Sequence, residues 1–482
     1  MKNCKRFLLL TLLCCSVSTT WSQSEKDYTE AKHLIEIWLE AQKDFDRLPG
    51  LTALVVHDQA IIWSGAFGMA NPEQQRPTQT ESLYSICSIS KLFTAVGIMQ
   101  LYDEGKLRLD DRVQDLLPWY NLQQQYPESG PITVRSLLTH SAGLPRESAH
   151  PYWSGPNFPF PSSAEVKKEL GTQETLYPAS TYFQYSNLGM TLLGEIISQV
   201  SGVPYEQYIQ DHILNPLGLQ NTRPYLPKDL HGKELTLGYS APTRSGERKR
   251  MPFFQANGIA PAAGFSSNVE DLGKFAAWQL RLLDTTATEV LRPATLKNMH
   301  RVHWTNPDWE LTWGLGFTVF KGWGGNTVVG HGGSCPGYQS TLRIDPKNKE
   351  AYVVMINAGG TSPNKYANGI RAILKKVKSG PAADSSKSKV NLEDYQGFYN
   401  LQPWWSELYI SSWEGQLVTL GLPSNNPTDD MTFYKHIEGD TFRRVRKDDT
   451  LGETLIFKRD ANGKVIRAER HSNNYLVRIE GR

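Results

Sequence analysis

The sequence predicts an α+β protein in which an antiparallel sheet is flanked by helices, a helical region is inserted, and a small antiparallel β-barrel follows. Strand-like apolar runs occur near the N-terminus and again at residues 313–357, so both ends of one domain supply its sheet. Residues 85–295, between these runs, have mostly helical spacing and long loops. After a linker at residues 379–390, eight short apolar runs alternate with turn residues up to residue 482.

The first 22 residues have the pattern of a secretory signal peptide. A basic head precedes a short apolar core that begins at Phe7, and small and polar residues extend to Ser22. This apolar core is too short to span a membrane. Adjacent cysteines, Cys14 and Cys15, raise the alternative of a lipoprotein, but the residues before Cys15 lack the small pair typical of such sites. We therefore expect an exported protein, periplasmic or secreted, without a lipid anchor.

Residues 23–378 contain the elements of the predicted sheet domain. A helix is expected near the start, followed by two strands that are hinged at residues 57–59, and a second helix closes the domain. These elements are the helix at 28–48, the strands at 51–57, 60–67, 313–320, 326–331, 337–345 and 350–357, and the helix at 365–377. We expect the two terminal helices to cover one face of the sheet and a cleft to lie where the sheet meets the helical region.

One loop of the helical region, residues 146–161, is rich in aromatic residues placed among prolines and glycines. Loops of this composition often line a substrate cleft. They also occur as packed surface loops, and the sequence leaves both interpretations open.

Residues 391–482 predict a small antiparallel barrel. Asp460-Ala-Asn-Gly463 is a hairpin turn signal between two of its runs. The runs are 395–399, 407–410, 416–420, 431–436, 441–445, 454–458, 465–471 and 475–479. This part carries no set of catalytic residues, so we interpret it as an accessory domain for stability, dimerisation or glycan contact.

The composition is that of an ordinary globular protein, with 39% hydrophobic residues, 21% charged residues and a net charge of +2. No basic patch or run of like charges indicates a nucleic-acid partner, and none is expected. The 13 Trp and 21 Tyr residues fit carbohydrate or aromatic recognition, and they equally fit a β-rich second domain.

The strongest chemical signal is Ser88 followed three residues later by Lys91 at the start of an apolar helix. This spacing places the hydroxyl and the amine on one helix face. A lysine shielded from water loses its proton more readily and can then act as the base for the serine. The helix that follows is apolar on nearly all sides, which predicts that it is buried. Two other Ser-x-x-Lys matches, 362–365 and 386–389, lie in polar segments and are interpreted as chance.

Two further groups can complete a catalytic set. Tyr185 and Asn187 precede an apolar helical stretch, and such a turn can direct a phenol and a carboxamide into one cleft, although it can also be a simple helix cap. His331 begins a His-Gly-Gly-Ser run that passes through Gly333 to Ser334, between two strand-like runs. Glycines in a strand indicate close approach of another backbone or of a ligand. The alternative for the histidine is a structural role.

In this order and spacing, the three motifs resemble those of the serine β-lactamase and penicillin-binding peptidase superfamily. The similarity is greatest to its class C β-lactamase-like branch, which includes D-alanyl-D-alanine carboxypeptidases, D-aminopeptidases and esterases. Stretches at 137–145, 264–272, 313–317 and 337–340 match the same branch, so the resemblance covers about residues 30–378. The C-terminal part resembles the lipocalin-like barrels that some members carry.

The resemblance implies a role for each motif residue. Ser88 is the nucleophile that becomes acylated, and Lys91 accepts its proton. Tyr185 serves as general base and acid for attack, leaving group and water, and Asn187 positions the substrate. His331 takes the place of a lysine that β-lactamases and many peptidases carry.

The resemblance also places an oxyanion hole at the backbone N–H groups of Ser88 and Ser334, with Gly333 in the substrate-binding strand. Cys87 and Cys335 are the only cysteines after the signal segment, and the resemblance places them side by side at this site. A disulfide between them is possible in an oxidising compartment. Two small buried thiols are the favoured interpretation, because the geometry of a bridge is demanding.

The predicted activity is hydrolysis of an ester or amide bond in a small molecule or short peptide through an acyl-Ser88 intermediate, without a metal or cofactor. A neutral imidazole at His331 anchors a carboxylate less well than an ammonium group. An esterase or D-amino-acid peptidase is therefore favoured over a true class C β-lactamase or D-Ala-D-Ala carboxypeptidase. The alternative from another class is a binding or sensor protein that turns over slowly, and the sequence predicts no oligomeric state.

Overall fold

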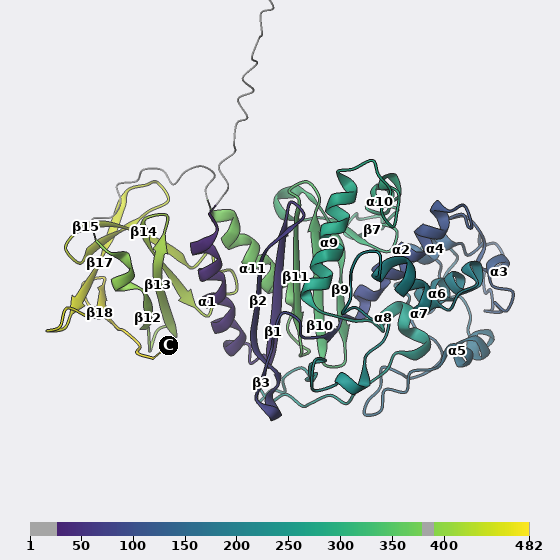
Figure 1. Ribbon diagram of the computed structural model, residues 1–482, viewed down its shortest axis with the longest axis horizontal. Helices are drawn as coiled ribbons and strands as arrows, with labels where there is room; N and C mark the ends of the chain where they lie inside the picture. Colours follow the sequence, from purple (N-terminus) through teal and green to yellow (C-terminus); the bar gives the residue numbers. More distant parts are fainter. Residues whose placement is uncertain (1–26, 378–389, 482) are drawn as a thin grey trace, which may run out of the picture.

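The computed structural model describes residues 27–377 and 390–481 (Figure 1). The expected signal segment and the linker, apart from its last residue, lie outside the described residues. The described residues form three parts: a sheet domain, a helical region inserted into it, and a C-terminal barrel.

The sheet of residues 27–377 has nine strands in the order β3-β2-β1-β11-β10-β9-β8-β7-β6, all antiparallel to their neighbours. The N-terminal strands therefore lie beside the C-terminal ones, as the sequence predicts; Leu51 of β1 pairs with Ile356 of β11. The strands are β1 (Gly50–His57), β2 (Ala60–Asn71), β3 (Arg76–Pro77), β6 (Trp304–Thr305), β7 (Thr312–Trp313), β8 (Thr318–Lys321), β9 (Thr327–Cys335), β10 (Tyr338–Asp345) and β11 (Glu350–Ile356).

Helices cover both faces of this sheet, and most of them belong to the inserted region. They are α1 (Thr29–Phe45), α2 (Ser90–Asp103), α3 (Val113–Leu116), α4 (Val134–Leu138), α5 (Ser163–Glu169), α6 (Asn187–Ser201), α7 (Tyr205–Ile209), α8 (Ala260–Ala263), α9 (Val269–Leu283), α10 (Pro293–Met299) and α11 (Pro363–Lys376). A separate two-stranded sheet joins β4 (Tyr84–Ser85) to β5 (Ser266–Ser267).

Strand β1 is buried on both sides because each of its faces is apolar. Alternate residues of a strand point to opposite faces. Ala53 and Val55 belong to the core shared with α1 and α11, whereas Leu54 and Val56 belong to the core shared with α9 and the inserted helices. Figure 1 shows α1 and α11 on one face of the sheet and α9 on the other. The prediction that both terminal helices share one face is confirmed.

Residues 390–481 form an eight-stranded antiparallel sheet whose strands follow one another in sequence order. Tyr399 of the first strand forms a bridge with Arg478, next to the last strand, so the barrel is almost closed. At the predicted hairpin turn, Asp460 N–H donates to Lys464 O at 2.9 Å. The strands are β12 (Gly397–Asn400), β13 (Glu407–Trp413), β14 (Gln416–Leu422), β15 (Met431–Glu438), β16 (Thr441–Val445), β17 (Leu451–Arg459), β18 (Val465–Arg470) and β19 (Asn474–Val477).

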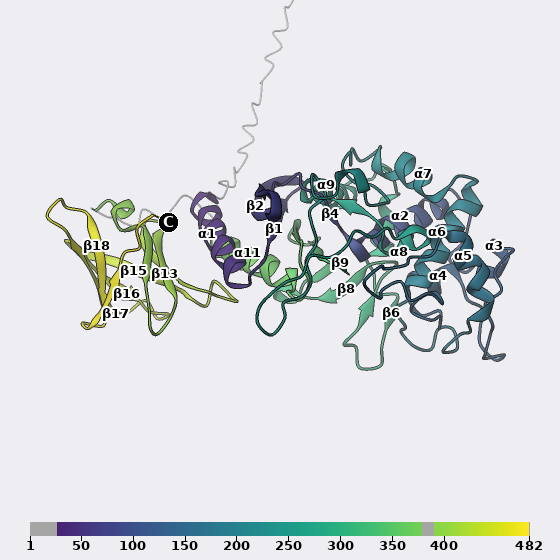
Figure 2. The same ribbon diagram turned by 90° about the horizontal axis from the view of Figure 1, so that it is seen from below.

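The barrel packs against α1, which lies between it and the large sheet (Figure 2). Leu420 of the barrel and Trp38 of α1 belong to one hydrophobic core. The Trp38 indole donates to Ser424 O at 2.9 Å, and the Ser412 hydroxyl donates to Glu30 at 2.8 Å. The two domains are therefore joined by a shared core as well as by the linker.

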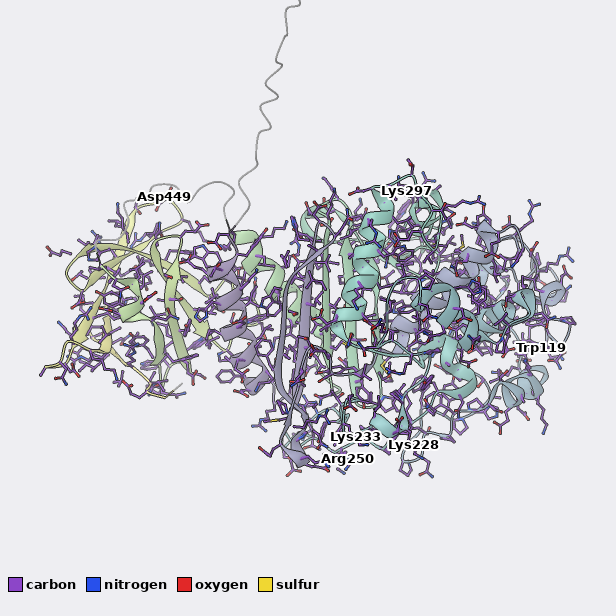
Figure 3. All side chains as sticks on the ribbon, in the orientation of Figure 1. Trp119, Lys228, Lys233, Arg250, Lys297 and Asp449 are labelled. Atoms are coloured by element: carbon purple, nitrogen blue, oxygen red, sulfur yellow. A yellow bond between two sulfur atoms is a disulfide. The ribbon has the colours of Figure 1, made fainter. Side chains whose placement is uncertain are left out.

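Charged side chains are spread over the surface of the molecule. Lys228, Lys233 and Arg250 project at one edge of the first domain, Lys297 at the opposite edge and Asp449 from the barrel (Figure 3), and all five are exposed. Within the described ranges, no helix is both long enough and apolar enough to cross a membrane.

Candidate active site

A pocket of about 540 Å³ lies where β9, β10 and the start of α11 meet the inserted helices. The structure brings Ser88, Tyr185, His331, Gly333 and Ser334 together on its wall, as the sequence predicts. The lining residues are Ser88, Arg146, Tyr185, His331, Gly332, Gly333, Ser334, Gln339, Ser340, Gly360, Thr361, Ser362, Pro363 and Asn364.

Ser88 lies in a 3₁₀ turn, Cys87–Ile89, that leads directly into α2. Backbone pairing holds this turn in place, because Ile86 N–H donates to Phe265 O at 2.9 Å next to the short β4–β5 sheet. The Ser90 hydroxyl accepts from Phe265 N–H at 3.0 Å. The turn therefore presents Ser88 from a rigid support, and α2 behind it is buried along nearly its whole length, as predicted.

The Lys91 amine is fully buried and has three oxygen neighbours. Its Nζ lies 2.7 Å from Asn187 Oδ1, 2.7 Å from Ala262 O and 3.2 Å from Ser88 Oγ. Burial lowers the pKa of Lys91 well below its ordinary value. A neutral amine has two N–H donors and one lone pair, so the two shorter contacts can use the donors and leave the lone pair for the Ser88 hydroxyl. This is the arrangement of a base beside a nucleophile.

The Tyr185 phenol lies on the open side of the same group. Its ring centroid is 4.9 Å from Lys91 Nζ, and its hydroxyl lies close enough to Ser88 for that side chain to lower the pKa of the phenol. Burial raises the pKa of Tyr185, and Ser88 opposes this only in part. The phenol therefore keeps its proton at neutral pH and can donate it.

Asn187 is the first residue of α6, and its side chain is buried below the pocket. The helix cap is its neighbour Ser186, whose hydroxyl accepts from Gly189 N–H at 2.8 Å. The Tyr-Ser-Asn turn is therefore both a capped helix start and part of the site. Because Ser186 caps the helix, the Asn187 amide is free to contact Lys91 and, through Nδ2, Glu147 at 2.8 and 3.0 Å.

His331 on β9 is buried, and its Nδ1 lies 2.5 Å from Gly332 O. Burial lowers the pKa of His331 to about 3, so the imidazole is neutral at neutral pH. A Cβ atom added to Gly333 would lie 2.2 Å from Ile86 O. The predicted close approach of another backbone is therefore confirmed, and the backbone is the segment that precedes Ser88.

Cys87 and Cys335 form a disulfide, so the favoured interpretation of two buried thiols is wrong. Their Cα atoms are 5.7 Å apart, which is within the usual range for a bridge. The physical reason is the glycine at position 333, which lets β9 approach the turn that carries Ser88. The sequence does not reveal this distance, because the two cysteines are 248 residues apart.

His140 and Trp313 also surround the site, and the sequence reasoning did not single them out. The His140 ring centroid lies 4.4 Å from that of Tyr185, and its Nδ1 accepts from Ser186 N–H at 3.2 Å. The Trp313 ring lies 5.6 Å from that of His331. Both residues occur in stretches that resemble the family, at 137–145 and 313–317, and this signal could have identified them.

The aromatic loop at 146–161 has two different parts. Tyr152 is buried and lies against Phe160, with ring centroids 4.9 Å apart, so these aromatic residues are packed rather than exposed to substrate. The first two residues of the loop, in contrast, reach the site: Arg146 lines the pocket, and Glu147 contacts Asn187. No pattern in the sequence distinguishes these two charged residues from others on the surface.

The Ser-x-x-Lys match at Ser362 lies at the start of α11 and is not a second catalytic pair. Lys365 Nζ is 2.7 Å from Asp46 Oδ2 and so pairs with the segment after α1. The match at 386–389 lies outside the described residues.

The chain is similar to proteins of one known family. The family model described as Beta-lactamase matches residues 38–375. Beta-lactamase-like protein 2 of Dictyostelium discoideum is 27% identical over 331 residues, which cover 66% of this chain and 57% of that protein. Penicillin-binding protein 4* of Bacillus subtilis (strain 168) is 29% identical over 317 residues, which cover 61% of this chain and 64% of that protein. The chain thus spans less than two thirds of the length of either relative.

The octameric penicillin-binding protein homologue from Pyrococcus abyssi has a similar structure, with a TM-score of 0.63 and 24% sequence identity. The match covers 92% of this chain and 99% of that chain, so it includes both domains. It confirms the predicted fold, including the C-terminal barrel.

Proposed function

The chain belongs to the beta-lactamase family, and on this basis we propose that it is a serine hydrolase that cleaves an ester or amide bond through an acyl-Ser88 intermediate. The contact of 3.2 Å between Lys91 Nζ and Ser88 Oγ carries this proposal, because burial lowers the pKa of the lysine at that place. A neutral amine beside a serine hydroxyl is an activated nucleophile.

Acylation begins when Ser88 Oγ attacks the carbonyl carbon of the substrate and the Lys91 amine takes the hydroxyl proton. The negative charge that forms on the carbonyl oxygen is stabilised by the backbone N–H groups of Ser88 and Ser334. Tyr185 donates its proton to the leaving alcohol or amine as the C–O or C–N bond breaks. The proton held by Lys91 then returns to Tyr185, so both groups are restored.

Deacylation uses the same groups in reverse. Water attacks the acyl carbon while the Tyr185 and Lys91 pair accepts its proton, and the bond to Ser88 Oγ breaks. The proton passes to Ser88, and the carboxylic acid leaves. Asn187 holds Lys91 in place throughout, through the contact at 2.7 Å.

Within this class we propose an esterase or D-amino-acid peptidase. The supporting observation is His331, whose pKa burial lowers to about 3, so this position offers no cation at neutral pH. An ester or a D-aminoacyl amide does not need a cation at this point, whereas a β-lactam carries a carboxylate.

A panel of short-chain p-nitrophenyl esters, D-aminoacyl amides and β-lactams tests the proposal in the wild type and in Ser88→Ala. We expect turnover of an ester or D-aminoacyl amide by the wild type and none by the variant. Turnover that survives in Ser88→Ala contradicts the serine mechanism.

The second candidate is a class C-type β-lactamase or D-Ala-D-Ala carboxypeptidase. Arg146 favours it, because its guanidinium lines the pocket and its side chain is 59% exposed, so it can bind a carboxylate. The designation of the Bacillus subtilis relative favours it as well. Hydrolysis of nitrocefin or of a D-Ala-D-Ala peptide at a rate comparable to that of the esters would reverse our ranking.

The alternative from another class, a slow binding or sensor protein, makes a distinct prediction. An acyl adduct on such a protein persists for hours, whereas we expect it to decay as fast as substrate turns over. Intact-mass measurement after a single addition of substrate distinguishes the two.

We further propose that the chain is exported, on the basis of the signal pattern in residues 1–22. Production in a bacterial host followed by mass measurement is expected to give a shortened chain outside the cytoplasm. A full-length chain in the cytoplasm contradicts export.

A further inference from the structure

Glu147 stands at the end of a chain of hydrogen bonds that starts at Ser88. Asn187 Nδ2 donates to both carboxylate oxygens of Glu147, at 2.8 and 3.0 Å. Oδ1 of the same amide accepts from Lys91 Nζ at 2.7 Å. The Tyr152 hydroxyl, itself buried, donates to Glu147 from the other side.

This arrangement determines which way the Asn187 amide faces. An ionised carboxylate can only accept hydrogen bonds, so the NH₂ group of the amide must point at Glu147. The amide oxygen must then point at Lys91. The backbone is held as well, because Asn187 N–H donates to Arg146 O at 2.7 Å.

Glu147 also supplies charge to the surroundings of Lys91. The titratable and charged side chains that face Lys91 come from four segments and are His140, Arg146, Glu147, Tyr185 and His331. Burial lowers the pKa of both histidines, so they carry no charge at neutral pH. Among the described residues, the charged side chains that remain around Lys91 are one anion, Glu147, and one cation, Arg146. Arg146 Nε lies 3.2 Å from Glu147 Oε1.

We propose that Glu147 is a positioning residue of this active site, which holds the Asn187 amide oxygen against Lys91 and supplies the anion that faces the Lys91 amine. The inference rests on the acyl-Ser88 mechanism proposed above. Glu147 is not among the residues that line the pocket, and its side chain is only 22% exposed. It therefore acts through Asn187 and Lys91 and does not touch the substrate.

The two influences on Lys91 oppose each other. Burial lowers the pKa of Lys91, and the negative charge of Glu147 raises it. A general base works best when it is unprotonated at the working pH and still basic. Without the carboxylate, the amine loses its proton at a lower pH but becomes a weaker base.

Two substitutions separate the charge from the orientation. Glu147→Gln keeps the length and an acceptor oxygen for Asn187 but removes the charge, whereas Glu147→Ala removes both. The measurement is the rate constant for labelling of Ser88 by a fluorophosphonate probe, in which Ser88 Oγ attacks phosphorus and fluoride leaves, recorded in the full chain from pH 4 to 9.

For Glu147→Gln we expect the midpoint of the acidic limb to fall by about one pH unit, because the charge that raised the pKa of Lys91 is gone. The rate on the plateau should fall about threefold to tenfold, since the amine is a weaker base. For Glu147→Ala the plateau should fall about 100-fold, because the Asn187 amide is no longer held in place.

Glu195→Gln is the matched control. Glu195 lies on α6, the helix that begins with Asn187, and its side chain is 16% exposed. It is bound by Lys167 at 2.7 Å and by the Ser163 hydroxyl, so its surroundings resemble those of Glu147. It lies about 12 Å further along the helix and has no contact with Lys91. We expect the midpoint of this variant to equal that of the wild type.

A midpoint in Glu147→Gln that stays at the wild-type value or rises overturns the inference, and so does a midpoint that moves equally in Glu195→Gln. If Glu147→Ala does not fold, the midpoint of Glu147→Gln decides alone, after its thermal unfolding has been matched to the wild type. A wild type that is not labelled at Ser88 overturns the proposed function and this inference with it. A labelled wild type with an unmoved Glu147→Gln midpoint overturns the inference only.

Discussion

Lys91 and His331 are buried and Tyr185 is partly buried, and loss of contact with water is the largest influence on the pKa of each. Surroundings of low polarity disfavour the charged form of a side chain, whichever sign the charge has. At neutral pH the site therefore contains a neutral amine, a protonated phenol and a neutral imidazole. These are the forms that a lysine base and a tyrosine acid need.

Replacement of the lysine tests this description directly. For Lys91→Ala we expect kcat/KM for ester hydrolysis to fall by about 10²–10⁴, which is the usual contribution of a positioned base. The wild-type rate should rise with pH through the lowered pKa of Lys91, and the variant should lose this acidic limb. If Lys91→Ala keeps kcat/KM within threefold of the wild type and shows the same acidic limb in its pH profile, the base is another group.

Buried neutral histidines predict how stability depends on pH. His300, which is buried against Phe317, has its pKa lowered by burial from 6.5 to about 3. Between these values the unfolded chain binds a proton that the folded chain does not bind. The contribution of neutral His300 to the free energy of unfolding is therefore fully present above pH 6.5. It is lost as the pH falls toward 3, at roughly 1 kcal/mol per pH unit.

His300→Gln isolates this contribution, because glutamine can keep a bond to Gln279, which lies 3.1 Å from His300 Nε2. Denaturant unfolding from pH 4.5 to 7 should show a shallower decline in the free energy of unfolding for the variant. If the free energy of unfolding declines equally steeply with falling pH in the wild type and in His300→Gln, His300 does not titrate in this way.

At the scale of elements, the residues proposed to be catalytic come from segments that are far apart in the chain. Ser88 precedes α2, Tyr185 precedes α6, and Ser334 is on β9. One disulfide joins the Ser88 turn to β9 through Cys87 and Cys335. Beside it, the hydroxyl of Ser340 on the neighbouring strand β10 donates to Ile86 O at 3.0 Å. The relative position of β9 and the Ser88 turn is thus built into the covalent structure.

Removal of this bridge should cost stability and activity. The double variant Cys87→Ala/Cys335→Ala opens a closure over 248 residues, and we expect a loss of about 2–5 kcal/mol in the free energy of unfolding. The rate of acylation should fall as well, because β9 carries Ser334. Tryptic mapping without reductant should recover the two cysteine peptides linked together, and recovery of both as free thiols would contradict the bridge.

The elements of this fold could be predicted from the sequence because each has a strong local signal. The strands β1 and β11 are continuous apolar runs, α2 is apolar all round, and the eight barrel strands alternate with turns. Ser88, Tyr185 and His331 stood out because their motifs occur in a known order. The role of Glu147 could not be predicted, and the disulfide was only the less favoured of two interpretations, because both depend on approaches between distant segments that leave no periodic pattern.

At the scale of the whole molecule, α1 connects the sheet domain to the barrel, with α11 in the same hydrophobic core. One hydrophobic core contains residues of α1, α11, β1 and the barrel strands β13 and β14. Trp38 lies at its centre and is fully buried. Figure 1 shows the barrel on the side of the large sheet that carries α1 and α11, whereas α2, the helix that follows Ser88, lies with the inserted helices away from the barrel. This position fits an accessory domain that stabilises the first one.

A substitution in this shared core tests whether the barrel is an accessory domain that stabilises the first domain. Trp38→Ala should destabilise the whole molecule by about 3–5 kcal/mol and leave kcat/KM per folded molecule unchanged, because Trp38 does not contact the pocket. Trp404→Ala is the matched control, since this side chain is 80% exposed and its loss should change stability by less than about 0.5 kcal/mol. Two separate unfolding transitions, of which Trp38→Ala shifts only one, would show that the domains do not share a core.

Covalent labelling shows whether Ser88 is the nucleophile of a serine hydrolase, as we propose. Wild type and Ser88→Ala are treated with a fluorophosphonate probe, and the site of attachment is found by mass spectrometry of the digested protein. We expect one adduct per wild-type chain, on the peptide that contains Ser88, and none in the variant. An adduct on another serine, or equal labelling of Ser88→Ala, would exclude Ser88 as the nucleophile.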